Sequence, residues 1–138
     1  MKVILVGHAN TAVSMKQAIE MIYGEAPDIY TLTFSPKEGL ADLKVKLEKQ
    51  ITGFEDDQVL VVTDLFSGTP YNAAATLAIS GKVTDVIAGM SLPICLEIVP
   101  LIQSATVEQV VTTVMQNYQN YTKAFSVISK KDLEEDDL

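Results

Sequence analysis

The chain has 138 residues and a formal net charge of −8, and 48% of its residues are hydrophobic. Ten lysines, no arginine, one histidine and one cysteine exclude an internal disulfide, guanidinium–phosphate chemistry and a basic surface for nucleic acid. A lone histidine also argues against a transition-metal site, so we expect no metal and no cofactor. No apolar run approaches the roughly 20 residues of a membrane span, and we predict a cytoplasmic protein.

The first half of the chain alternates short apolar runs with amphipathic segments. Residues 2–7 are rich in β-branched side chains and predict a buried strand, and 10–23 predict a helix. A second strand is expected over 28–34. The next helix is predicted over 35–53, because a cap residue, a proline in the first turn and a glutamate three residues after the cap mark its start.

The third strand and its loop follow. Residues 58–63 form the most strand-like run in the chain, and they lead into a small-residue loop, 64–70. A second cap-plus-proline start, at the end of this loop, predicts a helix that continues to Ile79. A fourth strand is predicted over 85–90.

The C-terminal third is expected to be mostly helical. A helix over 92–103 should be interrupted near Pro100, and a capping box begins another helix that runs over 106–118. A weaker strand is predicted over 124–129, while 130–138 is acidic without apolar periodicity. We therefore predict one domain, residues 1–129, with a solvated tail.

Strands that alternate with helices predict a three-layer, doubly wound α/β fold with a parallel sheet and right-handed crossovers. Four parallel strands in the order 2-1-3-4 are expected. The last strand, being less apolar, is placed at an edge and in an antiparallel direction.

Two chemically reactive side chains follow neighbouring strands. His8 comes directly after the first strand and Asp64 directly after the third. Ligands of open α/β sheets bind at the carboxyl ends of the strands, where the strand order reverses, so we expect these residues to meet there. A neutral imidazole can accept and pass on a phosphoryl group, and a carboxylate on its other ring nitrogen fixes the tautomer.

The loop after Asp64 supplies groups for an anion. Ser67, Gly68 and Thr69 offer hydroxyls and backbone N–H groups, and Pro70 opens a helix whose N-terminus favours negative charge. In a chain without arginine these are the natural phosphate ligands.

These motifs resemble the mannose-family enzyme IIA domain of the bacterial phosphoenolpyruvate-dependent sugar phosphotransferase system. The resemblance rests on Gly7-His8, on 64–73 (DLFSGTPYNA) and on 86–93 (VIAGMSLP). It covers the chain up to the acidic tail. Two departures are modest: Ala9 stands where the family often has glycine, and Phe66 where tryptophan is frequent.

The resemblance implies that His8 receives phosphate from the phosphocarrier protein HPr and passes it to a IIB domain, with the membrane IIC and IID components served indirectly. Asp64 would be the ring-nitrogen partner, and Ser67, Gly68 and Thr69 would lie beside the phosphate. Phe66 would keep an apolar contact for partner docking. Family members are homodimers that exchange the C-terminal strand, here 124–129.

Other interpretations remain open at this point. A IIA-like subunit of a dihydroxyacetone kinase system uses a similar histidine, but its loop lacks the Thr-Pro-aromatic-Asn run. A receiver-like regulatory module would need an acidic pair after the first strand, where Gly7-His8 stands. A non-enzymatic module whose His8 loop only binds a small anion is a further alternative. A serine hydrolase built on Ser67 or Thr69 is a weaker one, because there is no nucleophile elbow. The sequence names neither the sugar nor the ring nitrogen that carries phosphate.

Overall fold

Four parallel strands form the central sheet in the order β2-β1-β3-β4, as predicted. The structure is a computed structural model that describes residues 1–55 and 58–128. The strands are β1 (Lys2–His8), β2 (Ile29–Phe34), β3 (Val59–Thr63) and β4 (Asp85–Ala88). β1 is one residue longer than predicted, so His8 is its last residue and pairs in register with Phe34 of β2.

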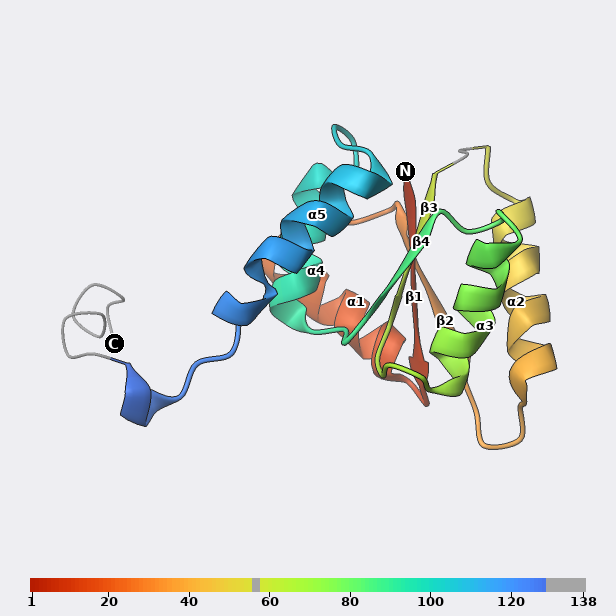
Figure 1. Cartoon of the computed structure of the whole chain (residues 1–138), viewed down its shortest axis with the longest axis horizontal. Helices are drawn as coiled ribbons and strands as arrows, with labels where there is room; N and C mark the ends of the chain where they lie inside the picture. Colours follow the sequence, from red (N-terminus) through yellow and green to blue (C-terminus); the bar gives the residue numbers. More distant parts are fainter. Residues whose placement is uncertain (56–57, 129–138) are drawn as a thin grey trace.

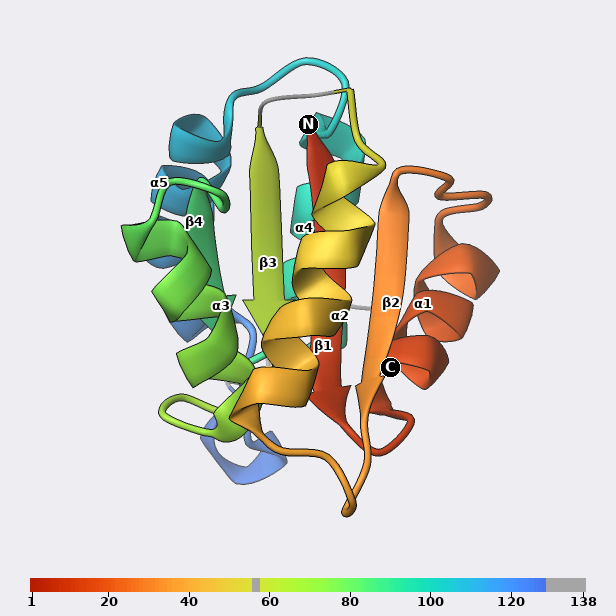
Figure 2. The same cartoon turned by 90° about the vertical axis from the view of Figure 1, so that its right-hand side faces the viewer.

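Helices cover both faces of this sheet (Figures 1 and 2). The α-helices are α1 (Thr11–Ile22), α2 (Leu40–Thr52), α3 (Thr69–Ile79), α4 (Leu92–Ile98) and α5 (Val107–Asn117). Three short 3₁₀ helices, η1 (Val99–Leu101), η2 (Tyr118–Asn120) and η3 (Phe125–Val127), follow α4 and α5. α2 and α3 lie on one face, and α1, α4 and α5 lie on the other, so the predicted three layers are confirmed.

The core consists of two clusters, one on each face of the sheet. Alternate residues of the central strands supply both clusters, because successive side chains of a strand point to opposite faces. Val3 and Leu5 of β1 face α1, α4 and α5, whereas Ile4 and Val6 face α2 and α3. A strand buried on both faces reads as a continuous apolar run, which is why 2–7 was recognisable in the sequence.

The start of α2 differs from the prediction. The Ser35 N–H donates to Glu38 Oε1 (2.9 Å) and the Glu38 N–H donates to the Ser35 carbonyl (3.1 Å), so the segment closes as a turn. The helix begins at Leu40, where the Gly39 N–H donates to Asp42 Oδ2 (2.8 Å). Proline and glutamate suit a turn as well as a first helical turn, and here the Gly39–Asp42 cap decides.

Two other helix predictions are confirmed. α4 ends at Ile98, and the chain passes into η1, which contains Pro100, as expected of a residue without an N–H donor. At the start of α5, Thr106 Oγ1 accepts from the Gln109 N–H (3.2 Å) and the Thr106 N–H donates to Gln109 Oε1 (2.9 Å). This is the predicted capping box.

The predicted C-terminal strand is not formed within the single chain. Residues 124–128 contain η3 and pair with no strand of the described part of the chain, and residue 129 lies outside it, as does the tail 130–138. Beyond α5 the chain leaves the body of the domain (Figure 1). A strand needs a neighbouring strand for its backbone hydrogen bonds, and residues 124–128 meet none among the described residues.

None of the helices in residues 1–55 and 58–128 combines the length and apolarity that crossing a membrane requires.

Candidate functional site

His8 and Asp64 meet at the carboxyl end of the sheet, as the strand order predicted. β1 and β3 are neighbours, and Val6 of β1 is in register with Thr63 of β3. The residues that follow them, His8 and Asp64 among them, therefore lie at the same end of the sheet. His8 Nδ1 lies 2.9 Å from Asp64 Oδ2, and the backbone N–H of His8 donates to that oxygen at 2.9 Å. One carboxylate oxygen thus holds both the main chain and the ring of the histidine.

The environment keeps Asp64 ionised and leaves the imidazole accessible. The His8 side chain is 49% exposed, whereas that of Asp64 is 18% exposed. Burial disfavours the charged carboxylate, but the backbone and ring hydrogen bonds from His8 outweigh it and hold the pKa of Asp64 below its usual value. Because an ionised Asp64 can only accept a hydrogen bond, this contact requires the proton on Nδ1, and in the neutral ring the free lone pair is then on Nε2.

Gly7 makes room for this pair. A Cβ atom at position 7 would lie 3.2 Å from Asp64 Cγ, from Asp64 Oδ2 and from Thr11 Cβ. These distances are shorter than ordinary van der Waals contacts, so any larger residue would push the carboxylate away from His8. The Thr11 hydroxyl donates to the His8 carbonyl at 2.5 Å and ties the strand end to the first turn of α1.

The loop between β3 and α3 brings its backbone to the His8 ring. Ser67 has a φ of 63°, in the left-handed region that non-glycine residues rarely adopt. Its carbonyl accepts a hydrogen bond from Asn72 Nδ2 at 3.2 Å. A Cβ atom on Gly68 would lie 3.4 Å from His8 Cε1, an ordinary contact distance, so the loop passes beside the edge of the ring between its two nitrogens.

α3 begins immediately after this contact. Gly68 is its N-cap, Thr69 its first residue and Pro70 its second, as the cap-plus-proline motif predicted. Within the described residues, no hydrogen bond joins the hydroxyl of Ser67 or Thr69 to His8. The structure therefore brings Gly68 to the imidazole directly and places Ser67 and Thr69 on either side of it in the chain.

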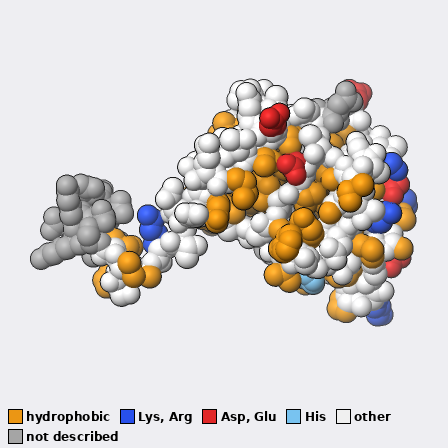
Figure 3. Space-filling model, in the orientation of Figure 1, with side chains coloured by type: hydrophobic (Ala, Val, Ile, Leu, Met, Phe, Trp, Pro, Cys, Tyr) orange, Lys and Arg blue, Asp and Glu red, His pale blue; other side chains and the backbone are white. Residues whose placement is uncertain are grey.

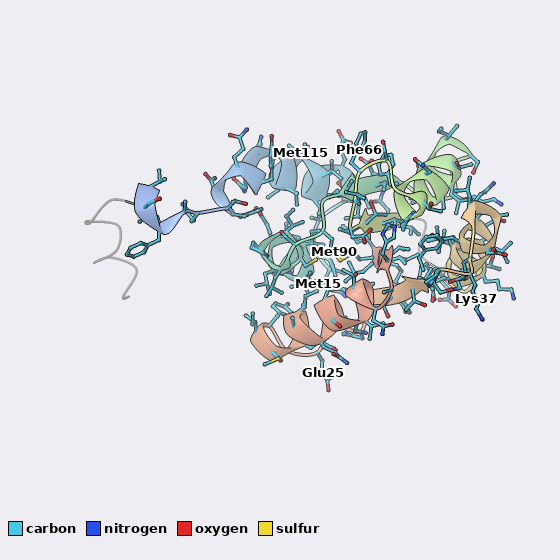
Figure 4. The ribbon with its side chains drawn as sticks, turned by 90° about the horizontal axis from the view of Figure 1, so that it is seen from below. Met15, Glu25, Lys37, Phe66, Met90 and Met115 are labelled. Carbon is cyan, nitrogen blue, oxygen red and sulfur yellow. The ribbon has the colours of Figure 1, made fainter. Side chains whose placement is uncertain are left out.

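Phe66 lies on the rim of the site. Its side chain is 68% exposed and contacts Tyr71 of α3, with ring centroids 4.9 Å apart. Leu65 beside it is 59% exposed. Figure 4, which views the molecule from the end where β1 terminates, has Phe66 in the loop that leads into α3. Two adjacent apolar side chains exposed next to a reactive group are suited to contact with another protein.

Sequence reasoning missed three residues that shape the site: Gly7 as a source of space, Thr11 and Phe34. Phe34 ends β2, and its ring contacts the His8 imidazole with centroids 5.5 Å apart and planes at 85°. Phe34 could have been found from the β1–β2 register, because that register pairs it with His8. Cys95 is buried, and burial raises the pKa of its thiol to about 12, so it is a core residue and not a reactive thiol of the site.

A metal centre is not supported by the residues that the structure describes. They contain no group of three or more histidine, cysteine, aspartate or glutamate side chains placed to hold a metal ion.

The chain is similar to known proteins of one family. The family described as PTS system fructose IIA component, EIIA-man, matches residues 2–115. A sorbose-specific EIIA component of the phosphotransferase system from Lacticaseibacillus casei is 43% identical over 138 residues, covering 100% of both chains. A fructose-specific EIIA component from Bacillus subtilis is 36% identical over 100 residues, which are 72% of this chain and 68% of the relative.

A solved structure is similar as well. The crystal structure of a phosphotransferase system component EIIA from Streptococcus agalactiae superposes with a TM-score of 0.84 at 26% identity, covering 92% of this chain and 98% of the other. The matches favour a sugar phosphotransferase component over the dihydroxyacetone kinase and receiver-like alternatives. The chain belongs to the EIIA-man family, and it is a phosphoryl-carrying IIA component of a sugar phosphotransferase system.

Proposed function

We propose that His8 is the phosphoryl carrier, and that Nε2 is the atom that takes the phosphoryl group from phosphorylated HPr and passes it to a IIB component. The observation that supports this most is the bond of His8 Nδ1 to Asp64 Oδ2 at 2.9 Å. It occupies one ring nitrogen and leaves the other on a half-exposed ring beside Gly68. This geometry favours Nε2 over Nδ1 as the atom that is phosphorylated. The sequence alone did not distinguish the two nitrogens.

The transfer is a substitution at phosphorus. The Nε2 lone pair forms a bond to the phosphorus atom while the bond from phosphorus to the donor breaks, and its electron pair stays with the donor. The Nδ1 proton remains on the ring, which becomes cationic. Asp64 is already ionised, and it stabilises this charge without moving a proton. Transfer to IIB repeats the step with Nε2 as the leaving atom.

The phosphoryl oxygens face the start of α3. The backbone N–H groups of a helix's first turn have no intrahelical acceptor and attract anions. At Gly68 this backbone passes beside the ring, and the hydroxyls of Ser67 and Thr69 lie on the two flanking residues. In a chain without arginine, these neutral donors hold a phosphoryl group and still release it to the next carrier.

We further propose that Phe66 and Leu65 form the apolar docking contact for HPr and IIB. Both side chains are more than half exposed and belong to the loop that touches His8. A cytoplasmic location follows from these partners, and the IIC and IID membrane components are reached through IIB.

The C-terminal segment is proposed to pair with a second copy of the chain. Phe125 and Val127 are 76% and 80% exposed on a segment that extends from the body (Figure 1). β4 is an edge strand of the sheet. In Figure 3, hydrophobic side chains gather on the surface between α5 and α3, on the side of the molecule where β4 lies. Met115 of α5 is 57% exposed. Strand exchange would cover both surfaces, and sedimentation at micromolar concentration should then give a homodimer; a monomer would contradict it.

The decisive experiment is phosphorylation with phosphoenolpyruvate, enzyme I and HPr. The protein should gain one acid-labile phosphate, and phosphorus NMR should place it on Nε2. His8→Ala should abolish the label, while Lys16→Ala on α1, away from the site, should retain it. Label that survives in His8→Ala would exclude the proposed carrier.

A further inference from the structure

Phe34 is fixed against the His8 ring by two kinds of contact. Its backbone is paired with His8 in the β1–β2 register, and the Ala9 N–H donates to the Phe34 carbonyl at 2.8 Å. Its side chain packs against the core cluster beneath α2 and α3. The phenyl ring is therefore anchored independently of the imidazole that it touches at a 5.5 Å centroid distance.

The imidazole needs such a neighbour because its other restraints are few. The His8 side chain is 49% exposed, and among residues 1–55 and 58–128 its one side-chain hydrogen bond is to Asp64. Rotation about the two side-chain bonds of a half-exposed histidine can carry the ring into solvent. The orientation in which Nδ1 meets Asp64 and Cε1 lies beside Gly68 is then lost.

The proposed phosphoryl transfer at His8 requires that one orientation. We infer that Phe34 is a positioning residue for this reaction: together with Gly68 it confines the imidazole so that Nδ1 stays bonded to Asp64 and Nε2 faces the start of α3. The effect of Phe34 on phosphoryl transfer rests on the proposed function. The confinement of the ring is a property of the unphosphorylated protein and can be tested without that function.

The tautomer of the His8 ring, which NMR detects, reports whether the ring is confined. His8 is the one histidine of the chain, so its nitrogen signals need no assignment. In long-range ¹H–¹⁵N NMR spectra of the neutral form, the wild type should show the Nδ1–H tautomer. Phe34→Leu should show a mixture of both tautomers, because the ring leaves Asp64 part of the time, and Phe34→Tyr should restore the single tautomer.

Phe54→Leu is the matched control. Phe54 is also a partly buried aromatic residue of the same core cluster, and its ring contacts Tyr30 at 4.7 Å, not His8. It should lose stability like Phe34→Leu and yet keep the wild-type tautomer. A single Nδ1–H tautomer in Phe34→Leu, or a mixture in Phe54→Leu as well, would overturn the inference.

Kinetics separate positioning from docking. With phosphorylated HPr as donor, kcat of Phe34→Leu should fall about 2- to 12-fold, the range that corresponds to one aromatic contact, with KM unchanged. A raised KM at unchanged kcat would make Phe34 a docking residue and contradict the inference. If the wild type gains no phosphate, the proposed function fails, while the tautomer spectra still decide whether Phe34 confines His8.

Discussion

β1 has a side chain bound to a carboxylate at each end, and the two pairs differ in what surrounds them. At its start Lys2 Nζ lies 2.6 Å from Asp28 Oδ1, and at its end His8 Nδ1 lies 2.9 Å from Asp64 Oδ2. The two carboxylates are similarly buried, with side chains 20% and 18% exposed. Each has a lowered pKa, Asp28 mainly through Lys2 and Asp64 through His8 against the opposing effect of burial. The pair by itself therefore does not mark a functional site.

The surroundings separate a structural pair from a reactive one. Asp28 also accepts from Gln103 Nε2 at 2.5 Å, so both of its oxygens are occupied by fixed donors. Around His8 the backbone is unusual instead: the two non-glycine residues with positive φ in the described part of the chain are Ala9 and Ser67. Both lie within a few residues of the pair. Left-handed backbone in non-glycine residues costs free energy and often accompanies function.

Removing the charge of each carboxylate gives the largest contrast. Asp64→Asn should slow phosphorylation of His8 by roughly 10- to 100-fold, by analogy with the loss seen when the hydrogen-bond partner of a metal-ligating histidine is changed. The amide loses the charge that selects the Nδ1–H tautomer and stabilises the cationic ring. Initial rates of His8 phosphorylation with phosphorylated HPr measure this slowing. Asp28→Asn, the matched control, should keep the wild-type rate, and equal losses in both variants would break the comparison.

Filling the space at Gly7 should have the next largest effect. Gly7→Ala places a Cβ 3.2 Å from Asp64 Cγ and Oδ2, so the carboxylate must shift from the ring. A rate loss of about 5- to 10-fold is expected, equivalent to about 1 to 1.4 kcal/mol of transition-state stabilisation. Gly53→Ala is the control: it meets only an ordinary contact, the Gln50 carbonyl at 3.5 Å. A Gly7→Ala variant as fast as wild type would show that Asp64 is not held as tightly as the distances indicate.

The opposite end of the strand should respond in stability and not in rate. Asp28→Asn should lower the free energy of unfolding at neutral pH by about 1 kcal/mol or less, since the pair is partly exposed. Because the folded pKa of Asp28 lies below its ordinary value of 3.8, this contribution is complete above pH 3.8 and is lost as the pH falls through the folded value. Urea unfolding at pH 7 and pH 3 should show the wild-type advantage shrink at pH 3; an advantage that grows there contradicts the assignment.

The smallest effect is expected at Ala9. Its φ of 52° lies in the left-handed region, which suits glycine better than alanine. Ala9→Gly relieves backbone strain but increases the freedom of the unfolded chain, so the net change in stability should be within about 1 kcal/mol. Thermal unfolding measures it. A larger loss would mean that the alanine methyl group has a packing role at the site.

Local patterns predicted much of the fold. The apolar runs of β1 and β3 are buried on both faces, and such strands have a recognisable composition. The Thr106–Gln109 capping box involves residues three apart, so it needed no tertiary information. The turn at Ser35–Glu38 was mistaken for a helix start because the same residue types serve both structures, and the later cap at Gly39 was decisive.

For the site, the sequence by itself determined which groups meet. His8 and Asp64 follow the first and third strands, which are neighbours in the 2-1-3-4 order expected of a small doubly wound domain and observed here. Only the tertiary structure decided how they meet: which ring nitrogen bonds to Asp64, that Gly7 clears the space, and that Phe34 touches the ring. These features depend on register and on distances of a few ångströms between segments remote in sequence. A pattern along one chain does not encode such distances, because they arise only when the sheet is assembled and packed.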